Sequence, residues 1–211
     1  PNPTNPPPVE IDHFPNTRAR LILQLPNNNT EQVDLAGPTT VHVLIPPDGT
    51  AHDLDGDGRD QVQTEMVDLS LSGNSSLGPV LVHLNPDQPT YGGIEEVNNA
   101  TPGTLDVPPF RPTGLADSFF DVFVELEVGG QTLRPAAPLR MESRIRHKPP
   151  APGDEYVNPF TQPIMLLDAA GTPTGIVPAF VGVVEAHPEG NRMSRGGEFP
   201  DLGHSTHDRS R

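Results

Sequence analysis

The sequence predicts an all-β protein, and three observations support that prediction. The 211 residues include 28 prolines scattered along the chain, and a proline inside a helix costs about 3 kcal/mol, which excludes a helical bundle. Several short segments alternate apolar and polar residues with the period of two that is typical of a half-buried strand. Turns rich in glycine and proline separate these segments. Strands with such spacing indicate a β-sandwich or a barrel.

We expect the β-sandwich, of jelly-roll or immunoglobulin-like type, with long Pro-rich loops and extended termini. Composition divides the chain into three parts. Residues 1–16 are predicted to be an extended Pro-rich N-terminal arm, because a proline run favours polyproline II structure. The sandwich domain is expected over 17–187. Residues 188–211 lack an apolar pattern and are predicted to be an irregular tail.

The first half of the expected domain contains five strand-like segments. The clearest is 18–25, in which Leu21, Leu23 and Leu25 face one way. The longest is 62–72, in which the pattern places Val67, Leu69 and Leu71 on the inner face. The five segments are 18–25, 30–35, 39–45, 62–72 and 80–84. Residues 85–118 hold few apolar runs and are predicted to be a long surface excursion.

The strongest hairpin signal follows at 119–128. Phe120, Val122, Val124, Leu126 and Val128 alternate with mostly acidic residues, and a Gly-Gly pair comes directly after them. The chain is expected to return through 131–134 and 139–147. Arginines on the outer face of 139–147 predict ion pairs with the acidic residues of the first strand. A second hairpin is expected from 164–167 and 175–185.

Charge and composition exclude several functions. The net charge of −15 and the pI near 4.7 argue against a nucleic-acid partner, because phosphate binding requires a basic face. The absence of cysteine excludes thiol catalysis, disulfide scaffolds and cysteine-based zinc sites. The chain has no run of about 18 apolar residues, so no membrane span is predicted.

The acidic loop around residues 52–60 predicts a calcium site. Asp53, Asp55 and Asp57 alternate, and Gly58 follows them, so that three carboxylates converge at a sharp bend. Three neighbouring carboxylates repel one another unless a cation neutralises them. Calcium accepts six to eight oxygen ligands at flexible angles and therefore fits this loop better than magnesium.

The remaining calcium ligands are expected just after the bend. The backbone oxygen of Arg59 is the next candidate, and Asp60 or Glu65 is expected to close the site. The pattern D-x-D-G-D-G at 53–58 resembles the calcium loops of dockerins, thrombospondin type 3 repeats and FG-GAP repeats. It departs from an EF-hand because Thr64 occupies the place of the closing acid. The alternative is an acidic turn without an ion.

No catalytic or cofactor-binding residue is assigned, and we expect a protein without enzymatic activity. The alternative is a secreted carbohydrate-active or other hydrolase or accessory domain. In that case Asp121, Glu125 and Glu127 would supply the carboxylates, in a cleft with Tyr91 or Tyr156. The spacing of the acids places them on one strand face, and such a face is usually solvated.

Two stretches, DSFFDVFVELEV at 117–128 and RMESRIRHKPP at 140–150, resemble parts of exported bacterial β-rich surface proteins. That resemblance implies secretion and a location outside the cell or on its surface. The sequons at Asn28, Asn74 and Asn99 leave glycosylation open. We therefore expect a calcium-stabilised extracellular structural protein. It would self-assemble into a filament, matrix or surface layer as a homo-oligomer or polymer joined through the N-terminal arm.

Overall fold

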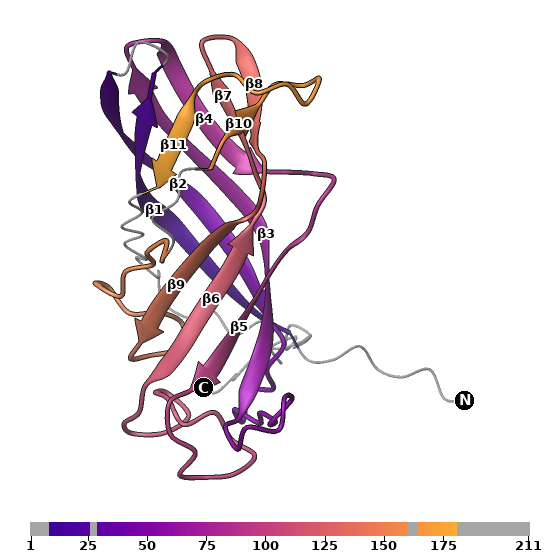
Figure 1. Ribbon diagram of the computed structural model, residues 1–211. Coiled ribbons are helices and arrows are strands. Elements are labelled where there is room, and N and C mark those ends of the chain that lie inside the picture. The colour runs from indigo at the N-terminus through magenta and orange to yellow at the C-terminus, as the bar shows by residue number, and fades with distance from the viewer. Residues whose placement is uncertain (1–8, 26–28, 160–163, 181–211) are drawn as a thin grey trace, which may run out of the picture.

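The computed structural model describes residues 9–25, 29–159 and 164–180. Within these ranges the chain forms eleven strands and no helix, and all pairings are antiparallel (Figure 1). The strands, in chain order, are β1 (Glu10–Gln24), β2 (Thr30–Val43), β3 (Gln61–Ser75), β4 (Gly78–Leu84), β5 (Thr90–Glu96), β6 (Ala116–Val122), β7 (Val124–Val128), β8 (Gln131–Pro135), β9 (Leu139–Ile145), β10 (Leu166–Leu167) and β11 (Val177–Phe180).

The first nine strands form a simple meander of long antiparallel strands. β1, β2 and β3 pair in order. β4 then pairs with the C-terminal part of β3 and β5 with its N-terminal part, so that the two together act as one long interrupted strand. In the same way β6 and β7 pair with β5 and β4, and β9 and β8 pair with β6 and β7. Each long strand is therefore shared between two halves of the sheet.

The predicted strand 119–128 is interrupted where it passes from one half to the other. Phe123 lies between β6 and β7. Its carbonyl accepts a hydrogen bond from the backbone N–H of Asn85, and its N–H donates to Oγ1 of Thr90. The local pattern was read correctly, because Val122 and Val124 are both buried. The change of partner strand depends on tertiary pairing, which the alternation does not encode.

The sheet wraps so that its two ends meet in one half. β10 pairs with β8 and β11 pairs with β1. The N–H of Leu166 donates to the carbonyl of Ile176, and the N–H of Thr174 donates to that of Leu166, which joins β10 to the residues leading into β11. Figure 1 shows β10 and β11 on the same side of the molecule. The apolar faces of the strands are thereby turned toward a common interior.

The all-β class is confirmed for the described residues. The sandwich type is not confirmed, because the described strands belong to one hydrogen-bonded sheet. The predicted excursion 85–118 is wrong in part, since it contains β5 at Thr90–Glu96 and the start of β6. The alternation of apolar and polar residues did not reveal β5, because this strand carries Gly92 and Gly93 where a strand usually has larger residues.

The predicted inner face of 62–72 is wrong in one respect. Leu69 and Leu71 are buried as expected, but Val67 is exposed. The pairing of β2 with β3 shifts register between Thr40 and Val41, opposite this point. A bulge inverts the facing of the strand, so Thr64 faces inward before the bulge and Leu69 after it.

The boundary of the predicted N-terminal arm also differs from the structure. β1 begins at Glu10, and residues 10–14 pair with β2 of the same chain. Phe14 is buried in the interior, whereas Val9 and Ile11 are exposed. Residues 1–8 and the predicted tail at 188–211 lie outside the described residues. The part of the arm that is described therefore belongs to the sheet, and the start of the domain moves from residue 17 to about residue 9.

Three buried carboxylates hold the loops at the end of the sheet where β3 begins. Glu96 is fully buried and accepts backbone N–H bonds from Asp60 and Asp106, at 3.0 and 2.8 Å. Asp106 in turn accepts the N–H groups of Ala100 and Thr101. Burial raises the pKa of Glu96, against the effect of its two N–H donors. Glu96 and the third carboxylate, Asp60, which accepts the N–H of Gly103, join the loop before β3 to the connection between β5 and β6, and Asp106 holds that connection together.

Lys148, the only lysine in the chain, is fully buried in the connection after β9. Its Nζ lies 2.8 Å from the carboxylate of Asp12 and 3.1 Å from that of Glu10, both on β1. Its backbone N–H donates to the carbonyl of Pro108. Farther along the connection, Val157 exchanges two backbone hydrogen bonds with Glu142 of β9. The connection therefore bridges β9 and β1 in the half of the sheet that β10 and β11 do not close.

We predict that Lys148→Met lowers the free energy of unfolding by about 3–5 kcal/mol, because it leaves the Asp12 carboxylate buried without its cation. Adding Asp12→Asn to this variant should restore part of the loss. Urea denaturation measures both. The matched control is Arg144→Met, which removes an exposed pair with Asp117 and should cost far less than Lys148→Met, because exposed ion pairs contribute little to stability. Equal costs for the two methionine variants would contradict the role given to Lys148.

Candidate functional site: an apolar cavity inside the sheet

The wrapped sheet encloses a cavity of about 110 Å³. Side chains from eight strands line it, and most of them are aliphatic or aromatic. The lining residues include the inward-facing positions of the central strands, namely Phe14 and Ala19 of β1, Leu35, Val41 and Val43 of β2, and Met66, Leu69 and Leu71 of β3. The remaining apolar wall comes from Val82, Ile94, Phe120, Val122, Val124, Leu139 and Met141.

The cavity is long compared with its volume. Along β3 its lining runs from Thr64 to Leu71. Seven residues of strand span roughly 23 Å, at a rise of ~3.3 Å per residue. Val43 of β2 pairs directly with Thr64. Gly92 of β5 pairs with Thr64 on the other side and also with Phe120 of β6, so Val43 and Phe120 lie at the same height in the sheet as Thr64. A small volume spread over this length describes a narrow channel that follows the strands.

Most polar side chains of the lining gather at one end of this channel. Ser118 of β6 and Tyr156 of the connection share a hydrogen bond of 2.8 Å between their hydroxyls, and both line the cavity. Burial holds the pKa of Tyr156 above its ordinary value, so the phenol stays protonated and can donate a hydrogen bond. The ring of Tyr156 lies 5.8 Å from that of Phe120, centroid to centroid.

Asp12 adds a charged group to the same end. Its carboxylate lines the cavity and is held by the Lys148 ammonium. Burial raises the pKa of Asp12, and the nearby ammonium opposes that effect. The ammonium serves Asp12 and Glu10 together, so this cluster contains two carboxylates for one cation.

Two threonine hydroxyls in the lining have no hydrogen-bond partner. They belong to Thr64, which is 2% exposed, and Thr39, which is 4% exposed. A buried hydroxyl without a partner is costly, and native proteins avoid most such cases. Thr64 lies at the polar end of the cavity, opposite Val43 on β2. Thr39 lies four residues away along β2, among apolar side chains.

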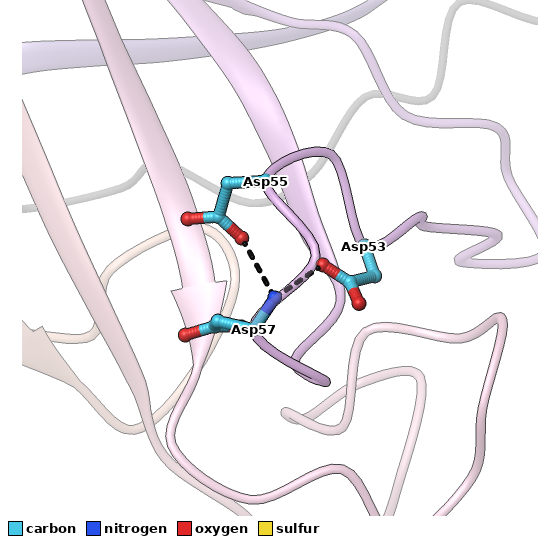
Figure 2. Close-up of side chains that lie close together, drawn as sticks. All are labelled: Asp53, Asp55 and Asp57. Atoms are coloured by element: carbon cyan, nitrogen blue, oxygen red, sulfur yellow. Dashed lines mark hydrogen bonds between the residues drawn. The ribbon is translucent and has the colours of Figure 1, made fainter.

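The acidic loop predicted from the sequence forms as a compact turn on the surface. The carboxylates of Asp53, Asp55 and Asp57 lie within 4.8 Å of one another, and all three residues are exposed (Figure 2). Asp53 accepts backbone N–H bonds from Gly56, Asp57 and Gly58 at 2.7, 3.1 and 2.9 Å. Hydrogen bonds within the loop therefore stabilise this turn.

The other residues predicted for the calcium site do not join this group in the described part of the chain. Arg59 turns its guanidinium onto Asp57 and Glu95, and its hydrogen bond lowers the pKa of Asp57. Asp60 is buried and accepts the N–H of Gly103 at 2.5 Å. Glu65 lies farther along on β3, opposite His42 and Tyr91. Calcium binding stays a prediction.

The acids proposed for a hydrolase do not meet in one cleft. Asp121 is on β6 and pairs with Arg140 at 3.0 Å. Glu125 is on β7 and is buried on the outer face between His83 and Arg134, at 3.1 and 2.6 Å. Glu127 is exposed. Of the two tyrosines named with them, Tyr91 is exposed and Tyr156 lines the interior cavity. Asp121 and Glu125 hold neighbouring strands together by cross-strand ion pairs.

No protein-family model matches this sequence, and no curated protein sequence matches it. Among solved structures, the fold is similar to that of DynF from the dynemicin biosynthesis pathway of Micromonospora chersina. The TM-score is 0.66, the sequence identity is 18%, and the match covers 88% of this chain and 87% of that chain. The similarity extends over nearly the whole chain and shows a shared fold.

The predicted function, an extracellular structural protein that assembles into a filament or surface layer, is wrong. The fold matches that of a biosynthesis-pathway protein, and the sheet encloses a cavity rather than packing two solid layers. The arm was expected to join neighbouring copies, but residues 10–14 of it pair with β2 of their own chain. Within the described ranges, no helix has the length and apolar character needed to cross a membrane.

The sequence did not predict the cavity, but it did predict several of the residues that line it. The alternation identified Leu69, Leu71, Val122 and Val124 as inward-facing, and all four line the cavity. A signal was present in the polar residues at inward positions, such as Ser118 between the apolar Ala116 and Phe120. Such a residue in an otherwise apolar face needs a partner in the interior.

The calcium prediction has a direct test. If the acidic loop holds calcium, millimolar calcium should raise the melting temperature of the parent protein, because the ion binds only the folded state. Asp55→Ala combined with Asp57→Ala should remove that rise. Differential scanning calorimetry with and without a chelator measures it. A control that removes two exposed acids elsewhere, Asp87 and Glu127, should keep the response. A parent protein that melts identically with calcium and chelator would contradict the prediction.

Proposed function

We propose that this protein binds an elongated, mainly apolar small molecule in the cavity of its sheet. The observation that carries the proposal is the narrow apolar channel, with polar groups gathered at one end. Small-molecule sites are typically concave and apolar, with a few placed polar groups that fix orientation. Transfer of apolar surface from water contributes about 25 cal/mol per Å², so a long apolar ligand gains affinity along its length.

The similarity of the fold to that of DynF supports a role in a biosynthetic pathway. DynF comes from the dynemicin biosynthesis pathway. We propose that this chain likewise holds an intermediate or product of a biosynthetic pathway. Apart from Asp12, which is paired with Lys148, the lining offers apolar contacts and hydroxyl groups, which suits binding and protection of the ligand rather than its chemical conversion.

The size of the cavity indicates that the ligand reshapes it. Ligand sites usually measure about 300–1,000 Å³, whereas this cavity measures about 110 Å³. Met66 and Met141 both line it, and methionine side chains are unbranched and adapt to irregular spaces. Movement of these two side chains would widen the channel without a change in the backbone.

Filling the cavity should abolish binding. Val41 lines the cavity beside Asp12, its partner in the pairing of β1 with β2, and we predict that Val41→Phe weakens binding of the neutral fluorescent probe aminoanthracene by more than about tenfold. The larger ring would occupy the space of the probe at a cost of about 1–3 kcal/mol in stability. Fluorescence titration measures the affinity, and urea denaturation confirms that the variant is folded.

The matched control is Val67→Phe, the same change on the exposed face of β3. It should leave the affinity for aminoanthracene unchanged. Equal loss of affinity in both variants would place the probe outside the cavity. A parent protein that does not bind the probe, and is not stabilised by any long-chain apolar compound, would overturn the proposed function.

A further inference from the structure

We propose that the ligand of this cavity is uncharged and that it places a hydroxyl or carbonyl oxygen against Thr64, with its apolar chain extending toward Leu71. This inference rests on the proposed function and specifies the class of molecule that the cavity selects. It is carried by three features of the lining: a buried hydroxyl without a partner, the hydroxyls around it, and the distribution of charge.

Thr64 supplies the first feature. Its side chain lines the cavity, is 2% exposed, and has no hydrogen-bond partner for Oγ1. The neighbouring strand approaches it closely, because a Cβ added at Gly92 would lie only 2.7 Å from this oxygen. Burial of an unpaired hydroxyl is unfavourable, and a ligand oxygen within reach would remove that cost. The hydroxyl can donate to a carbonyl or exchange hydrogen bonds with an alcohol.

The surroundings of Thr64 define a polar end. Phe120 lies beside Gly92, the residue of β5 that pairs with Thr64, and its ring lies close to that of Tyr156. Tyr156 and Ser118 form a hydroxyl pair in the same part of the lining. Thr39, the other hydroxyl without a partner, lies about 13 Å away, since four residues of strand separate its level from that of Thr64. Its neighbours Phe14 and Leu69 are apolar, so the head group belongs at Thr64.

The charge of the lining argues against an acidic head group. The polar side chains of the lining are Asp12 and the hydroxyl residues Thr17, Thr39, Thr64, Ser118 and Tyr156, and in the described chain no arginine, lysine or histidine lines the cavity. The nearby Lys148 ammonium already pairs with Asp12 and Glu10. A ligand carboxylate would therefore lose its hydration and meet an anionic side chain without a free cation.

The test compares decanol, methyl decanoate and decanoate, which share a chain length and differ in the head group. Each competes with aminoanthracene for the parent protein, at a mildly alkaline pH that ionises decanoate. We expect the two neutral compounds to displace the probe and decanoate to require at least about tenfold higher concentration. Thr64→Val keeps the shape of the side chain and removes the hydroxyl. The substitution should weaken the binding of decanol by roughly 3- to 10-fold, which is the effect of one lost hydrogen bond.

Thr132→Val is the matched control, because Thr132 is an exposed threonine of β8, and it should leave all three affinities unchanged. Aminoanthracene binding to the Thr64 variant shows that its cavity is intact. Decanoate that displaces the probe as well as decanol does would overturn the inference while leaving the proposed function standing. Decanol affinity that is the same in the parent and in Thr64→Val would overturn the placement of the head group. If the parent does not bind aminoanthracene, the proposed function itself fails.

Discussion

The enclosed interior depends on the ion cluster formed by Lys148, Asp12 and Glu10. The meander of paired strands leaves two edges, β1 on one side and β8 with β9 on the other. In one half, β10 and β11 join these edges through backbone hydrogen bonds. In the other half a connection without regular structure does so, and its anchor on β1 is the buried ammonium of Lys148. Backbone pairing therefore closes the interior in one half, and the buried ammonium of Lys148 holds it closed in the other.

The wrapped shape also requires irregularities within the strands. The register shift between β2 and β3, and the break at Phe123 between β6 and β7, allow long strands to bend around the interior. Glycine permits close approach where neighbouring strands would collide. A Cβ at Gly37 would lie 1.9 Å from the carbonyl oxygen of Ser70, and one at Gly92 would lie 2.0 Å from that of Phe119. Larger residues at these two positions would push the strands apart and open the wall of the cavity.

The binding site follows from this geometry. A sheet that turns its apolar face inward and does not pack against a second layer leaves space along its axis, and the side chains of β2 and β3 fill that space incompletely. The polar end forms where the irregular connection covers the sheet, because Tyr156 comes from the connection while Ser118 and Thr64 come from strands. The surface loop of Asp53, Asp55 and Asp57 lies outside this arrangement and is held by its own hydrogen bonds.

The sequence by itself determined the all-β class, most strand positions and the inward face of residues such as Leu21, Leu23 and Val124, because alternation with a period of two is a local property of the chain. It also determined the acidic turn, which local hydrogen bonds complete. Only the tertiary structure decided that the strands form one wrapped sheet around a cavity. Pairings such as Lys148 with Asp12, 136 residues apart, and Leu21 of β1 with Phe180 of β11 are non-local. No alternation pattern specifies the partner of a strand, so neither the cavity nor its unpaired hydroxyls could be read from the sequence.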